Sequence, residues 1–450
     1  MRRRNDAHGA ELERAAAAAI EGARRRGVAD ARAVVVRSRV VSVTYRLRRP
    51  EKVEESSRRG LTLYLYDGGR YSACETNDLR PEALERFLDS AAALTRATTP
   101  DPYREITDPA LYEGRADVAL GTFDPSVAAI APAERHALAA EAEAAVLAAA
   151  GKKAVAAEAG YEDEETELFQ MHSNGFAAGK RGTRLGLFAE VSLADEGDKR
   201  PSESEFASVR TRGALPDARA IGRGAAARAE LRLGAAPIET AVLPMILENR
   251  AVGRLLGKLL AGLGGRALQQ QQSFLSGARG TMVGSPVHDL VDDPFLVGGS
   301  ASRLFDGEGI AARRLPIFDR GVLRTYYLDT YYAKKLGEKP TTGSSSNLLL
   351  TPGPKSLDAL VAEIPRGVLV RGFVGGNSNP TTGDFSFGVF GTLIEDGKPS
   401  RAVAEMNVSG NHKDLWKRLV AAANDPWPYG SLRSPSLLID GVQFSGAGEG

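Results

Sequence analysis

The residues best suited to chemistry lie in one glycine- and asparagine-rich stretch, residues 375–386 (GGNSNPTTGDFS). An extended peptide that leaves water needs partners for its backbone N–H and C=O groups, because each buried group left unpaired costs about 1–3 kcal/mol. Amide, hydroxyl and carboxylate side chains supply such partners, and glycines let two backbones approach closely. The stretch therefore predicts a segment that binds an extended peptide by β-augmentation, although the same residues are also typical of a turn that only stabilises a β domain. The candidate binding residues are Asn377, Asn379, Thr382, Gly383, Asp384 and Ser386.

The histidines and the cysteine do not form a metal-binding pattern. No two histidines stand four or five residues apart, as a histidine pair on a zinc-binding helix requires. The single cysteine, Cys74, excludes an internal disulfide and a cysteine cluster for zinc or iron–sulfur. There is also no G-x-S-x-G nucleophile elbow and no phosphate-binding G-x-x-x-x-G-K-[ST] loop. The five histidines are His8, His136, His172, His288 and His412.

Acidic residues cluster with turn residues in two places. Asp292 and Asp293 precede a proline, and residues 305–309 (FDGEG) carry Asp306 and Glu308. Paired carboxylates could bind a divalent cation or do acid–base chemistry, but Asp and Gly are also common in β-turns. The second pair keeps open the alternative of an enzyme that uses an unrecognised carboxylate pair.

Composition limits the possible classes of protein. The 450 residues are enough for two large domains, and 43% hydrophobic with 26% charged residues is close to the globular average. The 58 basic and 57 acidic residues give a net charge of +1, so no whole-chain field exists to hold a nucleic acid. Because no run of about eighteen apolar residues occurs and the N-terminus lacks a convincing secretion signal, we expect a cytoplasmic protein that does not bind the membrane.

The first 235 residues show the periodicities of an N-terminal α+β domain. Ala-rich segments and apolar residues at helical spacing predict helices, whereas β-branched and alternating segments predict strands. The predicted helices cover residues 11–26, 81–95, 131–150 and 217–233. The predicted strands cover residues 31–48, 61–75 with a turn at 67–69, 154–195 with a turn at 173–175, and 203–212.

The remaining residues, 236–450, differ in composition and in the length of their predicted elements. A predicted strand at 240–247 and a helix at 249–262 precede glycine-rich sequence with short strands, which predicts a mostly β, barrel-like C-terminal domain. Four tyrosines in residues 326–333 could pack in its core or offer a flat surface to a peptide. The fold class expected overall is α+β, with an N-terminal α/β domain followed by this β-rich domain.

Several short motifs in this half, taken in order, resemble the C-terminal domain of the TldD/PmbA family, also written TldD/TldE. Each motif is weak alone, but the ordered series is specific. The matching motifs are Ser-Phe-Leu at 273–275, Asp-Asp-Pro at 292–294, Phe-Asp-Gly-Glu-Gly at 305–309, Gly-Val-Leu at 321–323, Asp-Thr-Tyr-Tyr-Ala at 329–333, residues 377–386, and Val-Ser-Gly-Asn at 408–411.

This sequence differs from the TldD member of the family at the metal-binding motif. The TldD member of the family has H-E-x-x-x-H on the first helix of this domain and a cysteine ligand near the C-terminus. The aligned stretch here places Asn249 and Arg254 at the histidine positions and Arg250 at the glutamate position, and Cys74 lies in the other half of the chain. A guanidinium stays protonated and repels a cation. The chain therefore resembles the PmbA/TldE subunit, which lacks the metal.

This resemblance implies a function. We expect the non-catalytic subunit of a TldD/TldE-type cytoplasmic metalloprotease that processes short or unfolded peptides. The chain itself would hold no cofactor, and zinc is expected in a TldD-like partner subunit of a heterodimer or larger assembly. The alternative is a homodimeric peptide-binding or scaffold protein that has no hydrolytic partner.

Overall fold

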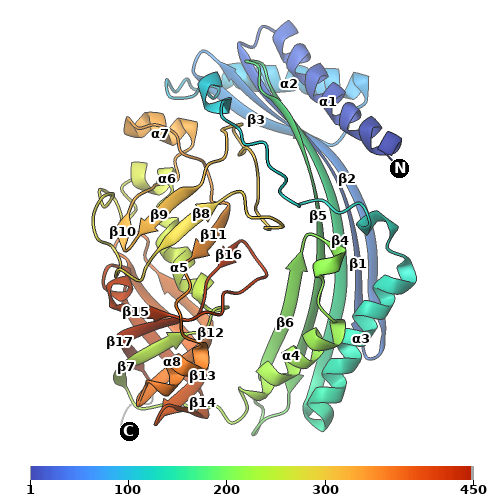
Figure 1. Ribbon diagram of the computed structural model, residues 1–450. Helices are drawn as coiled ribbons and strands as arrows, with labels where there is room; N and C mark the ends of the chain where they lie inside the picture. The colour runs from blue at the N-terminus through green and yellow to red at the C-terminus, as the bar shows by residue number, and fades with distance from the viewer. Residues whose placement is uncertain (1, 447–450) are drawn as a thin grey trace.

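The chain folds into two halves that face each other. The structure is a computed structural model that describes residues 2–446, and the side chains of residues 9–446. Figure 1 shows a long curved sheet on one side and a β-rich half, drawn in yellow to red, on the other. The expected α+β class, with a barrel-like C-terminal part, is confirmed.

The N-terminal half is built on one antiparallel sheet of six strands in the order β3-β2-β1-β4-β5-β6. Gly68 and Gly69 make the predicted turn between the second and third strands, with φ of 57° and 78°, values that suit glycine. The strands are β1 (Asp30–Arg46), β2 (Arg49–Asp67), β3 (Arg70–Thr76), β4 (Ala154–His172), β5 (Ala177–Leu193) and β6 (Ser202–Val209).

Four helices cover one face of this sheet. Side chains alternate between the two faces of a strand, so Ala33 and Leu63 pack under α1 and α2, while Leu185 and Leu187 pack under α3 and α4. The opposite face is left for the C-terminal half, and Arg32 Nη1 on that face donates to the Gly307 carbonyl at 2.9 Å. The helices are α1 (Arg2–Arg25), α2 (Pro81–Ala97), α3 (Pro132–Ala150) and α4 (Ala218–Glu230).

Strand β2 begins much earlier than the sequence predicts. The prediction started at residue 61, yet β2 pairs with β1 from Arg49 onward. Residues 49–59 are mostly charged or polar and are exposed on both faces, so they lack the alternation that identifies a strand. Pairing with the neighbouring strand, not burial, keeps them extended.

The C-terminal half contains a closed barrel and a second small sheet. The sheet order is β14-β13-β12-β7-β17-β15, and β14 also pairs with β17, which closes the barrel. The strands of this sheet are β7 (Ala241–Leu247), β12 (Arg366–Ser378), β13 (Asp384–Glu395), β14 (Lys398–Asn411), β15 (Leu419–Ala422) and β17 (Leu437–Ser445). The second sheet holds β8 (Leu290–Asp293), β9 (Leu315–Asp319), β10 (Val322–Leu323), β11 (Asn347–Leu350) and β16 (Leu432–Arg433). The helices of this half are α5 (Val252–Ala261), α6 (Gly265–Gln269), α7 (Thr330–Leu336), α8 (Leu357–Ala362) and α9 (His412–Leu415).

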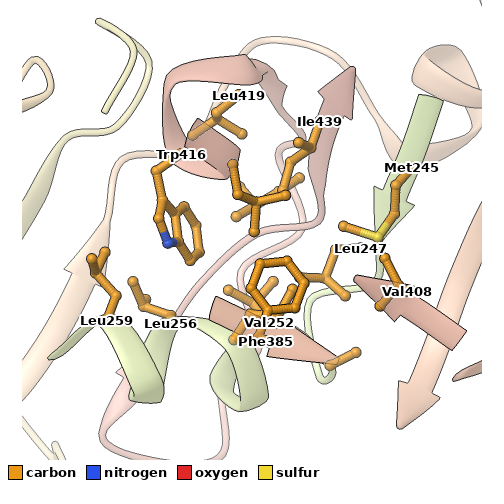
Figure 2. Close-up of a cluster of buried hydrophobic side chains, with 14 of the residues drawn as sticks. Met245, Leu247, Val252, Leu256, Leu259, Phe385, Val408, Trp416, Leu419 and Ile439 are labelled. Carbon is orange, nitrogen blue, oxygen red and sulfur yellow. The ribbon is translucent and has the colours of Figure 1, made fainter. Parts of the chain in front are cut away.

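Helix α5 fills the barrel core and thereby fixes the residues that precede it. Figure 2 shows its apolar side chains Val252, Leu256 and Leu259 in one cluster with Met245 on β7 and Trp416, which follows α9, and all five are 0% exposed. The sequence predicted a helix from residue 249, but α5 begins at Val252. Residues 249–251 are instead a turn at the rim of the barrel.

Residue 235, the predicted domain boundary, lies between α4 and β7, and the division there stays a prediction.

Candidate functional site

A pocket of about 710 Å³ lies between the two halves, where β6 faces the start of α5. Its walls come from β6, α4, the rim of α5, β12 and residues 427–432. We call it the interface pocket. Asn249, Arg250 and Arg254, the three positions expected from the sequence to match the family's metal motif, all line it.

Asn249 uses its side chain to hold a neighbouring loop. Its Nδ2 donates to the Asp425 carbonyl oxygen at 2.7 Å, and its backbone N–H donates to Ser436 Oγ at 3.0 Å. Asp425 in turn accepts from the Ser436 backbone and hydroxyl at 2.8 and 2.7 Å. The amide therefore acts as a donor within a closed hydrogen-bond network.

Arg250 joins the two halves of the molecule. Its Nη1 donates to Glu205 Oε2 at 2.7 Å and its Nη2 to the Ser204 carbonyl at 3.1 Å, both on or beside β6. The guanidinium also lies 4.6 Å from the ring centroid of Trp427, within cation–π distance. Burial and the nearby Arg228 lower the pKa of Arg250, but an arginine keeps its proton at any physiological pH.

Arg254 reaches the peptide-binding stretch predicted from the sequence. Its Nη2 donates to the Gly375 carbonyl at 3.3 Å, and its guanidinium lies 5.3 Å from the Phe387 ring centroid. The structure therefore brings this metal-site position and one end of residues 375–386 together.

A buried carboxylate beside the pocket was missed by the sequence analysis. Glu248 is 7% exposed and accepts from Arg228 at 3.2 and 2.8 Å and from Arg371 at 3.0 Å. The three residues come from β12, from α4 and from the residue after β7, so no local spacing in the sequence could have revealed the cluster. It ties the helix of the N-terminal half to two barrel strands.

The residues of this site do not fit a zinc ion. Zinc sites use histidine, cysteine and carboxylate ligands, whereas the aligned positions here hold two guanidinium groups and an amide whose nitrogen points at a carbonyl. Within residues 9–446, no group of three or more His, Cys, Asp or Glu side chains is placed to hold a metal.

The predicted peptide-binding residues form the hairpin turn between β12 and β13. Asn379 Oδ1 accepts from the Thr381 backbone at 2.9 Å, and Thr382 Oγ1 donates to Asp384 Oδ2 at 2.6 Å. Hydrogen bonds from Thr382 and then Asn411 lower the pKa of Asp384. Much of the hydrogen-bonding capacity of these side chains is thus used within the turn.

Of the remaining predicted residues, Asn377 and Ser386 lie on the paired strands and Gly383 lies in the turn. Asn377 is opposite Ser386 in the β12–β13 register, and the Gly383 carbonyl accepts from the His412 backbone at 2.8 Å. Gly383 has φ of 88°, so its place in the turn favours glycine. A role of any of these residues in binding stays a prediction.

Strand β12 has one open edge next to the interface pocket. On the side away from β13, β7 pairs only with Val368–Val370, and no strand in the described part of the chain pairs there with residues 371–378. Arg371, Gly372, Phe373 and Gly375 of this segment line the pocket. An extended peptide that entered the pocket would find an edge with which no other strand pairs, although the Gly375 carbonyl already accepts from Arg254.

The acidic FDGEG stretch is part of a loop network. Asp306 accepts from the backbone of Glu308 and Ile310 at 2.8 and 3.0 Å and from Thr342 Oγ1 at 3.0 Å. Glu308 accepts from both the backbone and the hydroxyl of Thr330, at 2.8 and 2.7 Å, and burial raises its pKa. The Asp306 carboxylate therefore holds its own loop and Thr342, whereas the Glu308 carboxylate binds the first residue of α7.

The tyrosine run divides between core and surface. Tyr326 and Tyr327 are buried, and the Tyr327 hydroxyl donates to Asp292 at 2.9 Å. Tyr331 lies at the contact with the N-terminal half, where its hydroxyl donates to Asp101 at 2.7 Å.

No helix in the described part of the chain combines the length and apolar character needed to cross a membrane.

Comparison with known proteins gives a consistent result along the chain. Family models described as PmbA/TldA metallopeptidase domain 1, central domain and C-terminal domain match residues 31–95, 125–233 and 240–446. Metalloprotease PmbA of Escherichia coli O157:H7 is 29% identical over 440 residues, which cover 97% of this chain and 96% of that protein.

Solved structures agree with this match. A putative modulator of DNA gyrase from Bacteroides thetaiotaomicron is 37% identical, with a TM-score of 0.93, and the match covers 97% of this chain and 99% of that one. TldE from Thermococcus kodakarensis shares the fold, with a TM-score of 0.86 at 20% identity, over 96% of this chain and 100% of that one.

Proposed function

The chain belongs to the PmbA/TldD metallopeptidase family, and from this premise we propose that it is the non-catalytic subunit of a two-component metalloprotease. In this proposal it shapes the chamber and binds peptide substrate, while a TldD-like partner supplies the zinc and the hydrolytic chemistry. The complex would work in the cytoplasm on short or unfolded peptides.

One observation carries the proposal. The three positions that align with H-E-x-x-x-H are occupied by Asn249, Arg250 and Arg254, and each side chain is engaged as a hydrogen-bond donor to protein oxygen atoms. A metal ligand must instead offer a lone pair to the cation. Hydrolysis by a metal in this pocket would therefore need a different set of residues.

The open edge of β12 supports the substrate-binding part. A peptide lying beside residues 371–378 would pair its backbone with this edge, which is a sequence-tolerant way to bind unfolded substrates. The adjoining pocket of about 710 Å³ has room for a few side chains. Phe206, 40% exposed on β6, offers an apolar contact on the opposite wall.

Co-purification from the native host tests the proposal. We expect a tagged chain to recover a TldD-like protein with intact H-E-x-x-x-H, and peptidase activity to require that partner and its zinc. A homodimer that binds peptides without recruiting any hydrolase would support the alternative of a binding or scaffold protein. Peptide cleavage by the chain purified alone would contradict both.

A further inference from the structure

A second cavity, of about 610 Å³, also lies between the two halves of the molecule. We call it the basic pocket. It is bounded by β4 and β5 of the N-terminal sheet, by residues 118–122, and by residues 300–305 of the C-terminal half. Four cationic residues line this pocket. No Asp or Glu of the described part of the chain is among its lining residues. The cations are Lys180, Arg181, Arg210 and Arg303.

Three of these four cations form no ion pair in the described part of the chain. Arg181 forms ion pairs with Glu165 and Glu167 at 3.2 and 2.7 Å. Within the described residues, no carboxylate lies within 4.0 Å of the charged groups of Lys180, Arg210 or Arg303. For a chain whose net charge is only +1, this is a strong local concentration of positive charge.

The two arginines are held in place by neutral acceptors. Arg210 donates to the Thr183 carbonyl at 3.0 Å and to the Ser300 carbonyl, and its buried Nε has no partner in the described part of the chain. Arg303 donates to the Thr342 and Ser344 hydroxyls, each at 3.2 Å. Carbonyl and hydroxyl oxygens orient a guanidinium but leave its charge uncompensated.

Lys180 is the freest of the three. Its Nζ has no hydrogen-bond partner among the described residues and lies 5.8 Å from the ring centroid of Phe305. Desolvation of the ammonium group, followed by repulsion from Arg303 and Arg210, lowers its pKa, whereas Asp306 acts in the opposite direction. The side chain as a whole is exposed, so a ligand can reach it. An anion that entered the pocket would relieve this repulsion.

The other walls of the basic pocket combine apolar side chains with a few hydroxyl groups. Leu120, Leu168, Leu304 and Phe305 line it beside the cations. The site therefore suits a ligand that carries a negative charge next to an apolar group, such as Glu or Asp beside a large hydrophobic residue in a peptide.

The basic pocket and the interface pocket lie on the same wall. Phe206 on β6 lines the interface pocket and Arg210, just past the end of β6, lines the basic pocket. Four residues of strand span about 13 Å, and an even spacing keeps both side chains on one face. A peptide of a few extended residues could contact both pockets.

We propose that the basic pocket binds acidic side chains of a peptide, so that this chain selects acidic, partly apolar peptides for the complex. This inference rests on the proposed function, because it takes the ligand of the cleft to be a peptide. It adds a preference for negative charge that the family relationship does not supply.

Titration calorimetry on the isolated full chain tests the inference. The probes are two end-blocked octapeptides, one alternating Leu with Glu and the other alternating Leu with Gln. We expect the Glu peptide to bind roughly tenfold more tightly, since charge-assisted hydrogen bonds are stronger than neutral ones. The difference should shrink as salt is raised, because the pocket is open to solvent.

Two variants test whether Lys180 in the basic pocket causes this difference in affinity. Lys180→Gln should weaken binding of the Glu peptide by about fivefold and leave the Gln peptide unchanged, since one of three uncompensated charges is removed. Lys152→Gln, an exposed lysine outside both pockets, is the matched control and should change neither affinity. A thermal melt of each variant checks that folding is intact.

Each contrary outcome is distinct. Equal affinity for the two peptides would overturn the acidic preference and leave the proposed function standing. No binding of either peptide would also overturn it, whatever the partner experiment shows. Displacement of the Glu peptide by inorganic phosphate at a lower concentration than the peptide itself would assign the pocket to phosphorylated ligands and contradict the proposal.

Discussion

Glu248 illustrates how a single buried charge stabilises this molecule. Its carboxylate accepts from guanidinium groups of Arg228 on α4 and Arg371 on β12, so three separate segments depend on one side chain. Removing one partner of a buried ion pair leaves the others uncompensated, and that cost exceeds the net value of the pair.

We predict that Glu248→Ala lowers the free energy of unfolding by about 3–5 kcal/mol, because two guanidinium groups lose their shared carboxylate. The matched control is Glu363→Ala, which removes an ion pair with Lys355 in which both side chains are 49% exposed. That change should cost less than about 1 kcal/mol. Urea denaturation of both variants measures the difference, and equal effects would show that the Glu248 cluster contributes little.

His288 gives a prediction about acid stability. It is 0% exposed and stacks between Phe318 and Trp416, with ring centroids 4.3 and 5.1 Å away. Neither ring nitrogen has a hydrogen-bond partner in the described part of the chain, and burial lowers its pKa from 6.5 to about 3. Between pH 6.5 and 3 the unfolded chain binds a proton at this position that the folded chain does not. Stability therefore falls as the pH falls through this window.

We predict that His288→Phe removes this part of the pH dependence. One such histidine costs the wild type about 2 kcal/mol of unfolding free energy between pH 7 and pH 5. Phenylalanine keeps the stacking and cannot take a proton. Between pH 7 and pH 5 the unfolding free energy of the variant should therefore fall by about 2 kcal/mol less than that of the wild type. Denaturant titrations at the two pH values measure it, and parallel losses in both proteins would mean that His288 is protonated in the folded state.

At the level of elements, periodicity identified most of the fold. Helices α2 and α3 and strands β1, β4, β5 and β7 were predicted close to their observed ends, because each buries one face or stripe and so carries a regular apolar pattern. The first part of β2 was missed because residues 49–59 bury nothing. The start of α5 was placed three residues early, since the turn at 249–251 carries no glycine or proline to mark it.

The site could be predicted only in part. Asn249, Arg250 and Arg254 were singled out by the resemblance to the family's H-E-x-x-x-H motif, and the structure places them in one pocket. Their partners Glu205, Ser204 and Asp425 come from distant segments, so the network that engages them depends on tertiary packing and has no sequence signal. The basic pocket was missed for the same reason.

The β12–β13 hairpin carries the next prediction. We expect the double change Asn379→Ala and Asp384→Ala to leave the fold intact, because both side chains are exposed, but to weaken peptide processing by the reconstituted complex. Turn hydrogen bonds from these residues contribute about 1 kcal/mol each, so a small fall in stability is also expected.

Thermal stability measured beside activity separates the two roles of the hairpin. If activity falls at a temperature where the variant is still fully folded, the segment contributes to binding. A loss of activity that the lower melting temperature fully explains would leave these residues a structural turn only.

For the whole molecule, ion pairs between the two halves fix how the halves face each other. Arg250 with Glu205 and Arg228 with Glu248 cross between the N-terminal α+β part and the barrel, with distances of 2.7 and 2.8 Å. The interface pocket and the basic pocket both lie along this contact. These ion pairs hold the two halves together beside the pockets.

Zinc stoichiometry in the co-purified complex tests the central claim most directly. The complex, isolated without chelators from the native host, should contain about one zinc for each TldD-like partner, and separation of the subunits should leave this chain with none. Peptidase activity should follow the zinc-bearing subunit. Elemental analysis that finds about one zinc retained on this chain, together with peptide cleavage by it alone, would contradict the account.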